Sequence, residues 1–372
     1  MIISIPKETE QSETRVALTP STAKILSKKH KLQIEIGAGL NSIFSDESYK
    51  LSGAEILSSN EIYNNCEIIC KVISPTIDEA NKFPIGSIYI GFLNPFNNKE
   101  ILKIFVERKI TSFAMEFIPR ISRAQNMDAL SSMATIAGYK AVLIALDKLP
   151  KMFPLMMTAA GTIAPATVLI LGAGVAGLQA IATAKRMGAK VSAFDPRPSV
   201  KEQINSVGAV FVEMPIEENI ETSGGYAKEQ SDAFLLKEQE VIGAQLSKTN
   251  VVISTAQIFG KKAPILITKQ MVEMMKPGSV IVDLAAEQGG NCELTIAGET
   301  VFHNGVQIIG PKNLPATLPI DASEMYSKNI LNLINNIFAK DELDWEEEVT
   351  KGACITRNGE IFHPMIKERF NQ

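Results

Sequence analysis

Three glycines with nucleotide-binding spacing directly follow an apolar run. Gly172, Gly174 and Gly177 are spaced as G-x-G-x-x-G, and the preceding run Thr167–Leu171 is β-branched and apolar, which is typical of a buried strand. In this spacing the first glycine allows a tight turn, the second lets the backbone approach a pyrophosphate, and the third lets the next helix pack close to the sheet. Free N–H groups at the N-terminus of that helix bind phosphate oxygens. The motif therefore predicts a dinucleotide site.

The elements after the glycines support this interpretation. A helix is predicted over 175–187, Gly188 ends it, and a second strand over 190–194 leads to Asp195. A carboxylate at this position can accept hydrogen bonds from the ribose hydroxyls of the adenosine, which favours NAD(H) over NADP(H). Arg197 follows two residues later, and an arginine there can accommodate a 2′-phosphate. We expect NAD(H), with that reservation.

Bulk properties limit the classes of function. The chain has 372 residues, of which 45% are hydrophobic and 21% charged, as in ordinary globular proteins, and its length favours two domains. A net charge of -4 gives no basis for binding nucleic acid. We expect no metal site and reduced thiols in the cytoplasm, because no zinc-type or C-x-x-C spacing joins Cys66, Cys70, Cys292 and Cys354. We also expect no membrane-spanning segment.

Alternating strand-like and helical patterns define the fold class. Strands are predicted at 1–5, 32–36, 67–73, 87–93 and 111–117 before the glycines, and at 209–212, 251–254, 279–283 and 306–309 after them. Such alternation predicts parallel, doubly wound sheets. The first set has no G-x-G-x-x-G of its own, so we do not expect a second nucleotide site there.

Two long helices connect the predicted domains. One covers about 129–149, and the other begins at Asp321 with Glu324 as the partner of a capping box. The class is thus α/β, with two doubly wound Rossmann-like domains and a ligand cleft between them. We place the N-terminal domain at 1–128 plus 322–372 and the NAD(H)-binding domain at 129–321.

Several long blocks resemble one family over nearly the whole chain. They are AAGTIAPATVLILGAGVAGLQAIATAKRMGA, PRISRAQNMDALSS, SGGYAKE and MKPGSVIVDLAAEQGGN. They resemble the NAD(H)-binding alpha subunit of proton-translocating NAD(P) transhydrogenases, and the opening PKETEQSETRVALTP is shared with the related alanine dehydrogenases. The resemblance implies hydride transfer between NADH and NADP+ on an NADP(H)-binding partner subunit, coupled to a membrane-spanning proton-channel subunit. It also implies a homodimer held by these partners at the inner, cytoplasmic face of the plasma membrane.

The resemblance assigns roles to individual residues. Residues expected to act at the nicotinamide end are Arg120, Gln125, Asp128 and Ser131, with Tyr226 on a loop that closes over the nucleotide. Further contacts to the cofactor are expected from Ile121, Ser122, Val175, Asp195, Pro196, Arg197, Gly225 and Gln257 in addition to the three glycines. From the residues alone, Gln125 and Asp128 could equally be a solvated helix cap, Tyr226 a surface aromatic and Arg120 a surface charge.

Histidine placement distinguishes the related activities. A dehydrogenase acting on an amino acid needs an acid or base near the reacting carbon, and alanine dehydrogenases use a histidine after the strand at 87–93. Here that region reads IYIGFLNPFNN, and we expect structural roles for His30, His303 and His363. Hydride transfer between two nicotinamides needs only ring alignment in a dry pocket. The transhydrogenase subunit is favoured, with a soluble NAD-dependent alanine dehydrogenase and an NAD-sensing module without turnover as alternatives.

Three further residues have two possible interpretations. Arg15 and Lys71 are retained where alanine dehydrogenases hold the substrate carboxylate, and Glu287 stands where those enzymes usually have aspartate. A structural ion pair is the other interpretation.

Overall fold

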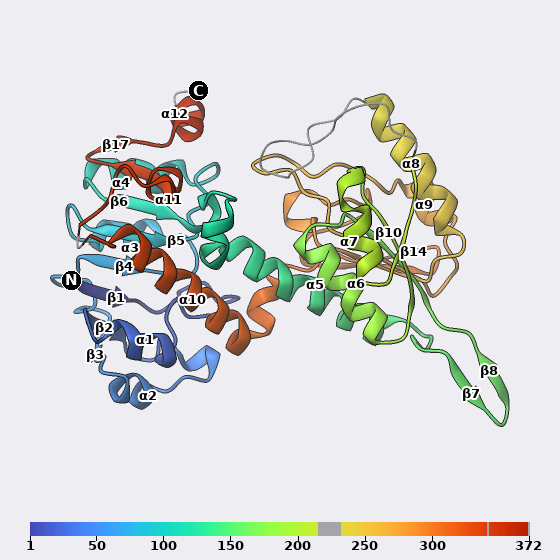
Figure 1. Cartoon of the computed structure of the whole chain (residues 1–372), viewed down its shortest axis with the longest axis horizontal. Coiled ribbons are helices and arrows are strands. Elements are labelled where there is room, and N and C mark those ends of the chain that lie inside the picture. The colour runs from blue at the N-terminus through green and yellow to red at the C-terminus, as the bar shows by residue number, and fades with distance from the viewer. Residues whose placement is uncertain (215–231, 341, 371–372) are drawn as a thin grey trace. The chain divides into compact units, whose positions relative to one another are not determined.

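The computed structural model describes residues 1–214, 232–340 and 342–370. Contacts divide the chain into two compact units, with unit 1 formed by Met1–Met133 and Pro315–Gln372 and unit 2 by Ala134–Leu314. The domain limits expected from the sequence, and the cleft between domains, stay predictions. Each unit contains its own sheet (Figure 1).

The sheet of unit 1 is parallel through its centre. Its parallel strands run in the order β3-β2-β1-β4-β5-β6, so the order reverses at β1, as in doubly wound nucleotide-binding folds. These strands are nearly continuous apolar runs because both faces of the sheet are covered. Their bounds are β1 Ile2–Ile5, β2 Lys31–Glu35, β3 Glu55–Leu57, β4 Ile68–Cys70, β5 Ile88–Gly91 and β6 Thr111–Ala114.

An antiparallel hairpin completes this sheet at the β6 edge. β16 (Cys354–Arg357) pairs antiparallel with β6 and with β17 (Glu360–Ile361). Asn358 and Gly359 between them have φ values of 52° and 81°, as the predicted type I′ turn requires. The helices of unit 1 are α1 Pro20–Leu26, α2 Asp46–Leu51, α3 Ile77–Lys82, α4 Lys99–Glu107, α10 Pro319–Ile337, α11 Glu348–Ala353 and α12 Pro364–Phe370, with 3-10 turns at Leu40–Ser42, Met115–Phe117 and Ser122–Met127.

The predicted start of the last long helix was wrong. α10 begins at Pro319, because proline is well suited to the first turn, where its missing N–H is not needed. Glu324 therefore lies in the second turn and makes no capping box. Its carboxylate instead accepts a hydrogen bond from the Ser21 hydroxyl at 3.1 Å.

The sheet of unit 2 repeats the same strand order. Parallel strands run β11-β10-β9-β12-β13-β15, and β14 pairs antiparallel with β15. The order reverses between β9 and β12, which is where doubly wound sheets bind ligands at the carboxyl ends of their strands. The bounds are β9 Thr167–Leu171, β10 Lys190–Phe194, β11 Val210–Phe211, β12 Val251–Ser254, β13 Val280–Asp283, β14 Thr300–His303 and β15 Val306–Ile309.

Alternate residues of β9 belong to two separate cores. Val168 and Ile170 pack in one cluster with helices α5 (Ala129–Lys148), α6 (Val175–Arg186) and α7 (Lys201–Ser206). Leu169 and Leu171 pack in the other with α8 (Asp232–Leu246) and α9 (Lys269–Glu273). Because successive side chains of a strand point to opposite faces, helices cover both sides of this sheet. The sequence prediction of a doubly wound α/β fold is confirmed.

Helix α5 corrects one expectation. Within the described residues it is long and apolar enough to cross a membrane, with a mean hydropathy of 1.5. We expected no such segment because polar residues interrupt the run, but they are too few to lower the average. Core helices pass the same test, and Ala141, Val142 and Ala145 of α5 are fully buried in unit 2. The helix is therefore weak evidence for a span.

Candidate functional site

Two glycines of the predicted nucleotide motif cannot be replaced without distortion. Gly172 has a φ of +93°, a conformation that favours glycine. A Cβ on Gly177 would lie only 1.9 Å from the carbonyl oxygen of Gly172. The tight turn between β9 and α6 thus depends on both residues. Thr255, at the end of β12, supports the turn by donating its hydroxyl to the Gly172 carbonyl at 3.2 Å.

Gly174 has a different environment. It is the N-cap of α6 with extended backbone angles that any residue can adopt, and a Cβ there would meet nothing within 4 Å. No side chain caps this end of α6 among the described residues, and Val175 after it is 40% exposed. Backbone N–H groups at a helix N-terminus, with open space beside them, fit the pyrophosphate of a dinucleotide.

Asp195 is more constrained than its sequence position indicates. It is 3% exposed, and its carboxylate accepts a hydrogen bond from the backbone N–H of Ala173 at 2.7 Å. Arg197 donates its backbone N–H at 3.0 Å and two guanidinium N–H groups at 2.9 and 2.8 Å to the same carboxylate. Asp195 thus ties the glycine turn to the end of β10 and occupies the arginine that could otherwise meet a 2′-phosphate. Pro196 between them is half-buried.

Gln257 lies on the loop after β12 and contacts the loop after β13. Its side-chain amide donates to the carbonyl of Leu284 at 3.0 Å and accepts from the Gln288 amide at 3.4 Å. Unit 2 thus brings the glycine turn, Asp195 and Gln257 to the carboxyl edge of one sheet.

The connector residues lie in unit 1, on and beside the 3-10 turn Ser122–Met127. Arg120, Ser122 and Gln125 are exposed, and Ile121 is half-buried. Asp128 accepts hydrogen bonds from the backbone N–H of Ser131 at 2.8 Å and from its hydroxyl at 2.6 Å. Asp128 therefore caps α5, which is one of the two interpretations that the sequence allowed. Gly225 and Tyr226 lie outside the described residues.

Sequence reasoning missed a buried acid beside Asp195. Glu238 on α8 is 2% exposed, and burial, with the negative charge of Asp195, raises its pKa to about 8. Ile242, one turn further along the same helix face, packs in the cluster that contains Phe194. A helical pattern cannot reveal this, because the pattern shows that a residue faces inward but not which charge it meets.

Glu238 makes a testable contribution to pH dependence. A carboxyl whose pKa is higher in the folded state stabilises the fold most below its ordinary pKa of 4.5, and this stabilisation is lost as pH rises through about 8. We expect the unfolding temperature to fall by several degrees more between pH 6 and pH 9 in the unaltered protein than in Glu238→Gln. Thermal unfolding followed by circular dichroism measures this. Glu240→Gln, at an exposed position on the same helix, is the control, and parallel profiles for all three proteins would contradict the assignment.

Lys71 and Arg15 form the ion pairs that the sequence left open. Lys71 is 0% exposed, and its Nζ lies 2.7 Å from Glu79 and 3.4 Å from Glu8. Burial acts to lower the pKa of Lys71, but the two carboxylates hold it above its ordinary value. Arg15 is 5% exposed and pairs with Glu13 at 2.5 Å. In unit 2, Glu287 accepts a hydrogen bond from the backbone N–H of Asn313 at 3.2 Å.

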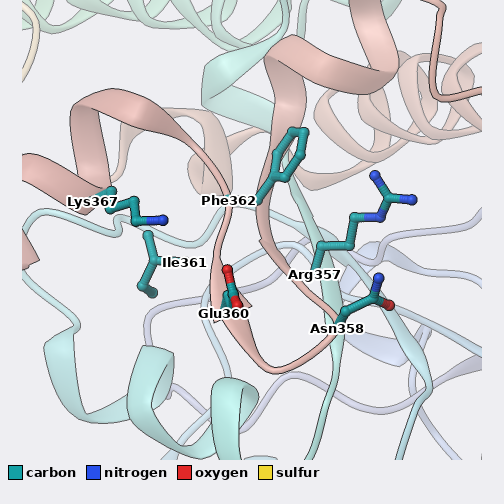
Figure 2. Close-up of a pocket in the computed structure, with 6 residues that line it drawn as sticks. All are labelled: Arg357, Asn358, Glu360, Ile361, Phe362 and Lys367. Atoms are coloured by element: carbon teal, nitrogen blue, oxygen red, sulfur yellow. The ribbon is translucent and has the colours of Figure 1, made fainter.

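A shallow pocket of about 370 Å³ lies elsewhere, at the β16–β17 hairpin of unit 1. Figure 2 shows Lys367 and Ile361 on one side of it and Arg357 and Asn358 on the other. The guanidinium of Arg357 stacks over Trp345 at 3.5 Å from the ring centroid, so packing within the unit explains its position. No residue predicted for the nucleotide site lines this pocket.

Comparison with known proteins agrees with this geometry. The family models "Alanine dehydrogenase/PNT, N-terminal domain" and "Alanine dehydrogenase/PNT, C-terminal domain" match residues 4–137 and 141–364. The first of the separately encoded portions of NAD(P) transhydrogenase subunit alpha from Rhodospirillum rubrum is 43% identical, over 98% of this chain and 99% of the relative. An alanine dehydrogenase of Methanococcus maripaludis is 32% identical over 79% of this chain and 74% of that protein. The crystal structure of transhydrogenase from Sinorhizobium meliloti matches with a TM-score of 0.87 at 37% identity, covering 98% of this chain and 100% of that one. The chain therefore belongs to the alanine dehydrogenase/PNT family and, within it, resembles the alpha subunits of NAD(P) transhydrogenases over almost its full length.

Proposed function

We propose that this chain is the NAD(H)-binding subunit of a proton-translocating NAD(P) transhydrogenase. The observation that carries the proposal is the open backbone cradle at Gly174, placed at the switch point of the unit 2 sheet. The full-length similarity to the Rhodospirillum rubrum transhydrogenase alpha chain selects the reaction. Hydride passes between NADH on this chain and NADP+ on a partner subunit, and membrane subunits couple the transfer to proton movement.

The chain's own residues have limited roles in this reaction. The glycine turn and the N-terminus of α6 bind the pyrophosphate, while the charge of Asp195 disfavours a 2′-phosphate. Arg120, Gln125, Asp128 and Ser131 orient the nicotinamide, and Tyr226 with Gly225 closes over the nucleotide. The nicotinamide ring supplies the hydride chemistry when it is bound, so the protein needs alignment and exclusion of water rather than an acid or base.

An alanine dehydrogenase is the second candidate, and the site supports it less well. Binding a substrate carboxylate at Lys71 would require breaking its pair with Glu79, since this amine is fully buried between two carboxylates. The histidines are also engaged elsewhere in their units. His303 lies 2.9 Å from Glu273, and His363 packs edge-on against Phe117.

Assembly with further subunits is included in the proposal. The relatives' designation as subunit alpha supports a multi-subunit complex, in which an NADP(H)-binding subunit and a membrane-spanning subunit hold this chain at the inner face of the plasma membrane. The cytoplasmic thiols that we expect fit the four cysteines, all of which are buried and free.

A homodimer is also proposed, and a projecting hairpin supports it. β7 (Met156–Thr158) and β8 (Gly161–Ile163) pair only with each other, extend away from the rest of unit 2 (Figure 1), and expose all their residues. An isolated two-stranded hairpin is marginally stable in water, and this one carries apolar side chains that a second copy would cover.

Charge on this hairpin should dissociate the dimer. Met157 is 79% exposed, so Met157→Lys costs little within one chain but places a charge at the contact. We expect light scattering after size-exclusion chromatography to give the mass of one chain for this variant and of two for the unaltered protein. Met274→Lys, at an exposed methionine off the hairpin, is the control. A dimer that withstands Met157→Lys would exclude the hairpin as the contact.

Reconstitution tests the proposed reaction. The purified chain is mixed with an NADP(H)-binding transhydrogenase subunit, and hydride exchange is followed with 4-deuterated NADH. Direct appearance of the label in NADPH supports the proposal. Reduction of NAD+ by alanine with the chain alone would instead establish the dehydrogenase, and tight NADH binding with neither activity would establish a binding module.

A further inference from the structure

We propose that Asp283 and Asn291 are positioning residues for the nicotinamide half of the bound nucleotide. The inference rests on the proposed function and adds to it two residues that do not contact the cofactor. In doubly wound sheets each half of the strand set takes one mononucleotide. Because β10 and Asp195 mark the adenosine half, the loops after β12 and β13 must form the other half.

Asp283 organises the loop after its own strand. It is 0% exposed at the end of β13, and one carboxylate oxygen accepts from the Ser254 hydroxyl at 2.9 Å and the Ala285 N–H at 3.0 Å. The other oxygen accepts from the N–H groups of Asn291 and Cys292 at 2.7 and 3.0 Å and from the hydroxyl of Thr295 at 2.7 Å. One buried carboxylate thus fixes both ends of the loop 284–291.

Asn291 connects that loop to the one after β12. It is 0% exposed, its side-chain oxygen accepts from the Ala256 N–H at 3.0 Å, and its side-chain amide donates to the Ala256 carbonyl at 2.9 Å. The same amide donates to the Pro264 carbonyl at 2.9 Å. Asn291 therefore holds both backbone groups of Ala256, the residue immediately before Gln257.

Gln257 is the residue whose position this arrangement determines. Its backbone starts from the fixed Ala256, and its side chain reaches Leu284, directly after Asp283. Such contacts must be kept because buried polar groups left without partners cost more than the hydrogen bonds contribute. Loss of Asn291 should therefore displace Gln257 without disturbing the glycine turn or Asp195, which hold the adenosine half.

Comparison of two ligands tests this. For Asn291→Ala and the milder Asn291→Asp, which removes only the donor, calorimetry measures affinity for NADH and for 5′-ADP, which lacks the nicotinamide half. We expect NADH affinity to fall about tenfold in Asn291→Ala and 5′-ADP affinity to change less than about twofold. Emission of bound NADH, which reports on the nicotinamide environment, should shift in both variants.

A matched asparagine at the opposite edge is the control. Asn250 precedes β12, and its side chain accepts from the Thr167 N–H at 3.0 Å at the amino edge of the sheet. Asn250→Ala should lower the unfolding temperature but leave both affinities unchanged. Equal losses of NADH and 5′-ADP affinity in Asn291→Asp, or unchanged NADH affinity in Asn291→Ala, would overturn the inference. Absence of NADH binding in the unaltered chain would instead refute the proposed function.

Discussion

Replacing Gly174 with valine should abolish NADH binding while leaving the fold intact. The backbone of Gly174 has φ -73° and ψ -170°, which valine adopts readily, and a Cβ there meets no atom within 4 Å. The branched side chain would nevertheless occupy the space through which a pyrophosphate reaches the N–H groups of α6. We expect NADH affinity to fall at least about 100-fold, measured by calorimetry, with an unfolding temperature within about 2 °C of the unaltered protein.

Gly177→Ala is the matched control, because it should act in the opposite way. Its Cβ would overlap the Gly172 carbonyl at 1.9 Å, so the turn or helix α6 must shift. Forced overpacking costs about 1–3 kcal/mol, which should appear as a lower unfolding temperature whether or not nucleotide is present. Full NADH affinity in Gly174→Val would show that the pyrophosphate does not lie at this turn.

Sequence patterns located the long elements but not the short ones. β9, β10, β12 and β15 agree with their predicted ranges, since buried parallel strands are continuous apolar runs that periodicity detects. α2, α3 and β3 were missed because a helix of six residues or a strand of three has too few positions to establish a period. A helix predicted over residues 59–65 is instead a series of turns.

The candidate site was predictable only where its residues are neighbours in the chain. Gly172, Gly174, Gly177 and Asp195 belong to one strand–turn–helix–strand unit, so their spacing carries the information. The pairing of Asn291 with Ala256 joins residues 35 positions apart across two strands. The strand order decides that these loops meet, and local patterns do not specify strand order.

The first unit shows why the glycines, and not the strand order, indicate nucleotide binding. Its parallel strands follow the same order, yet β1 is followed by an extended segment and not by a turn into a helix. That segment is held by α10, with the backbone N–H groups of Val16 and Thr19 donating to Ser323 and Ser327 at 3.0 Å. The helix after β1 starts only at Pro20. Two sheets of one topology thus serve different purposes.

Gln125→Asn should slow hydride exchange greatly while NADH affinity stays nearly unchanged. The side chain of Gln125 is exposed on the 3-10 turn Ser122–Met127, so its carboxamide is available to the nicotinamide amide or its ribose. Asparagine keeps the same donor and acceptor but withdraws them by about one methylene. A misplacement of about 1 Å can cost about 100-fold in rate when alignment is the main contribution to catalysis.

Single-turnover exchange at saturating NADH, with the NADP(H)-binding partner present, separates rate from affinity. We expect the rate to fall about 100-fold and the dissociation constant of NADH to stay within about twofold. Asn126→Ala is the control, because Asn126 is the exposed neighbour and contacts Asn329 and Asn332 only through its backbone carbonyl, so both quantities should be unchanged. A large loss of affinity at an unchanged rate would mean that Gln125 holds the cofactor without aligning it. The nicotinamide would then be oriented by unit 2, where Gln257 is the residue at the corresponding end of the sheet.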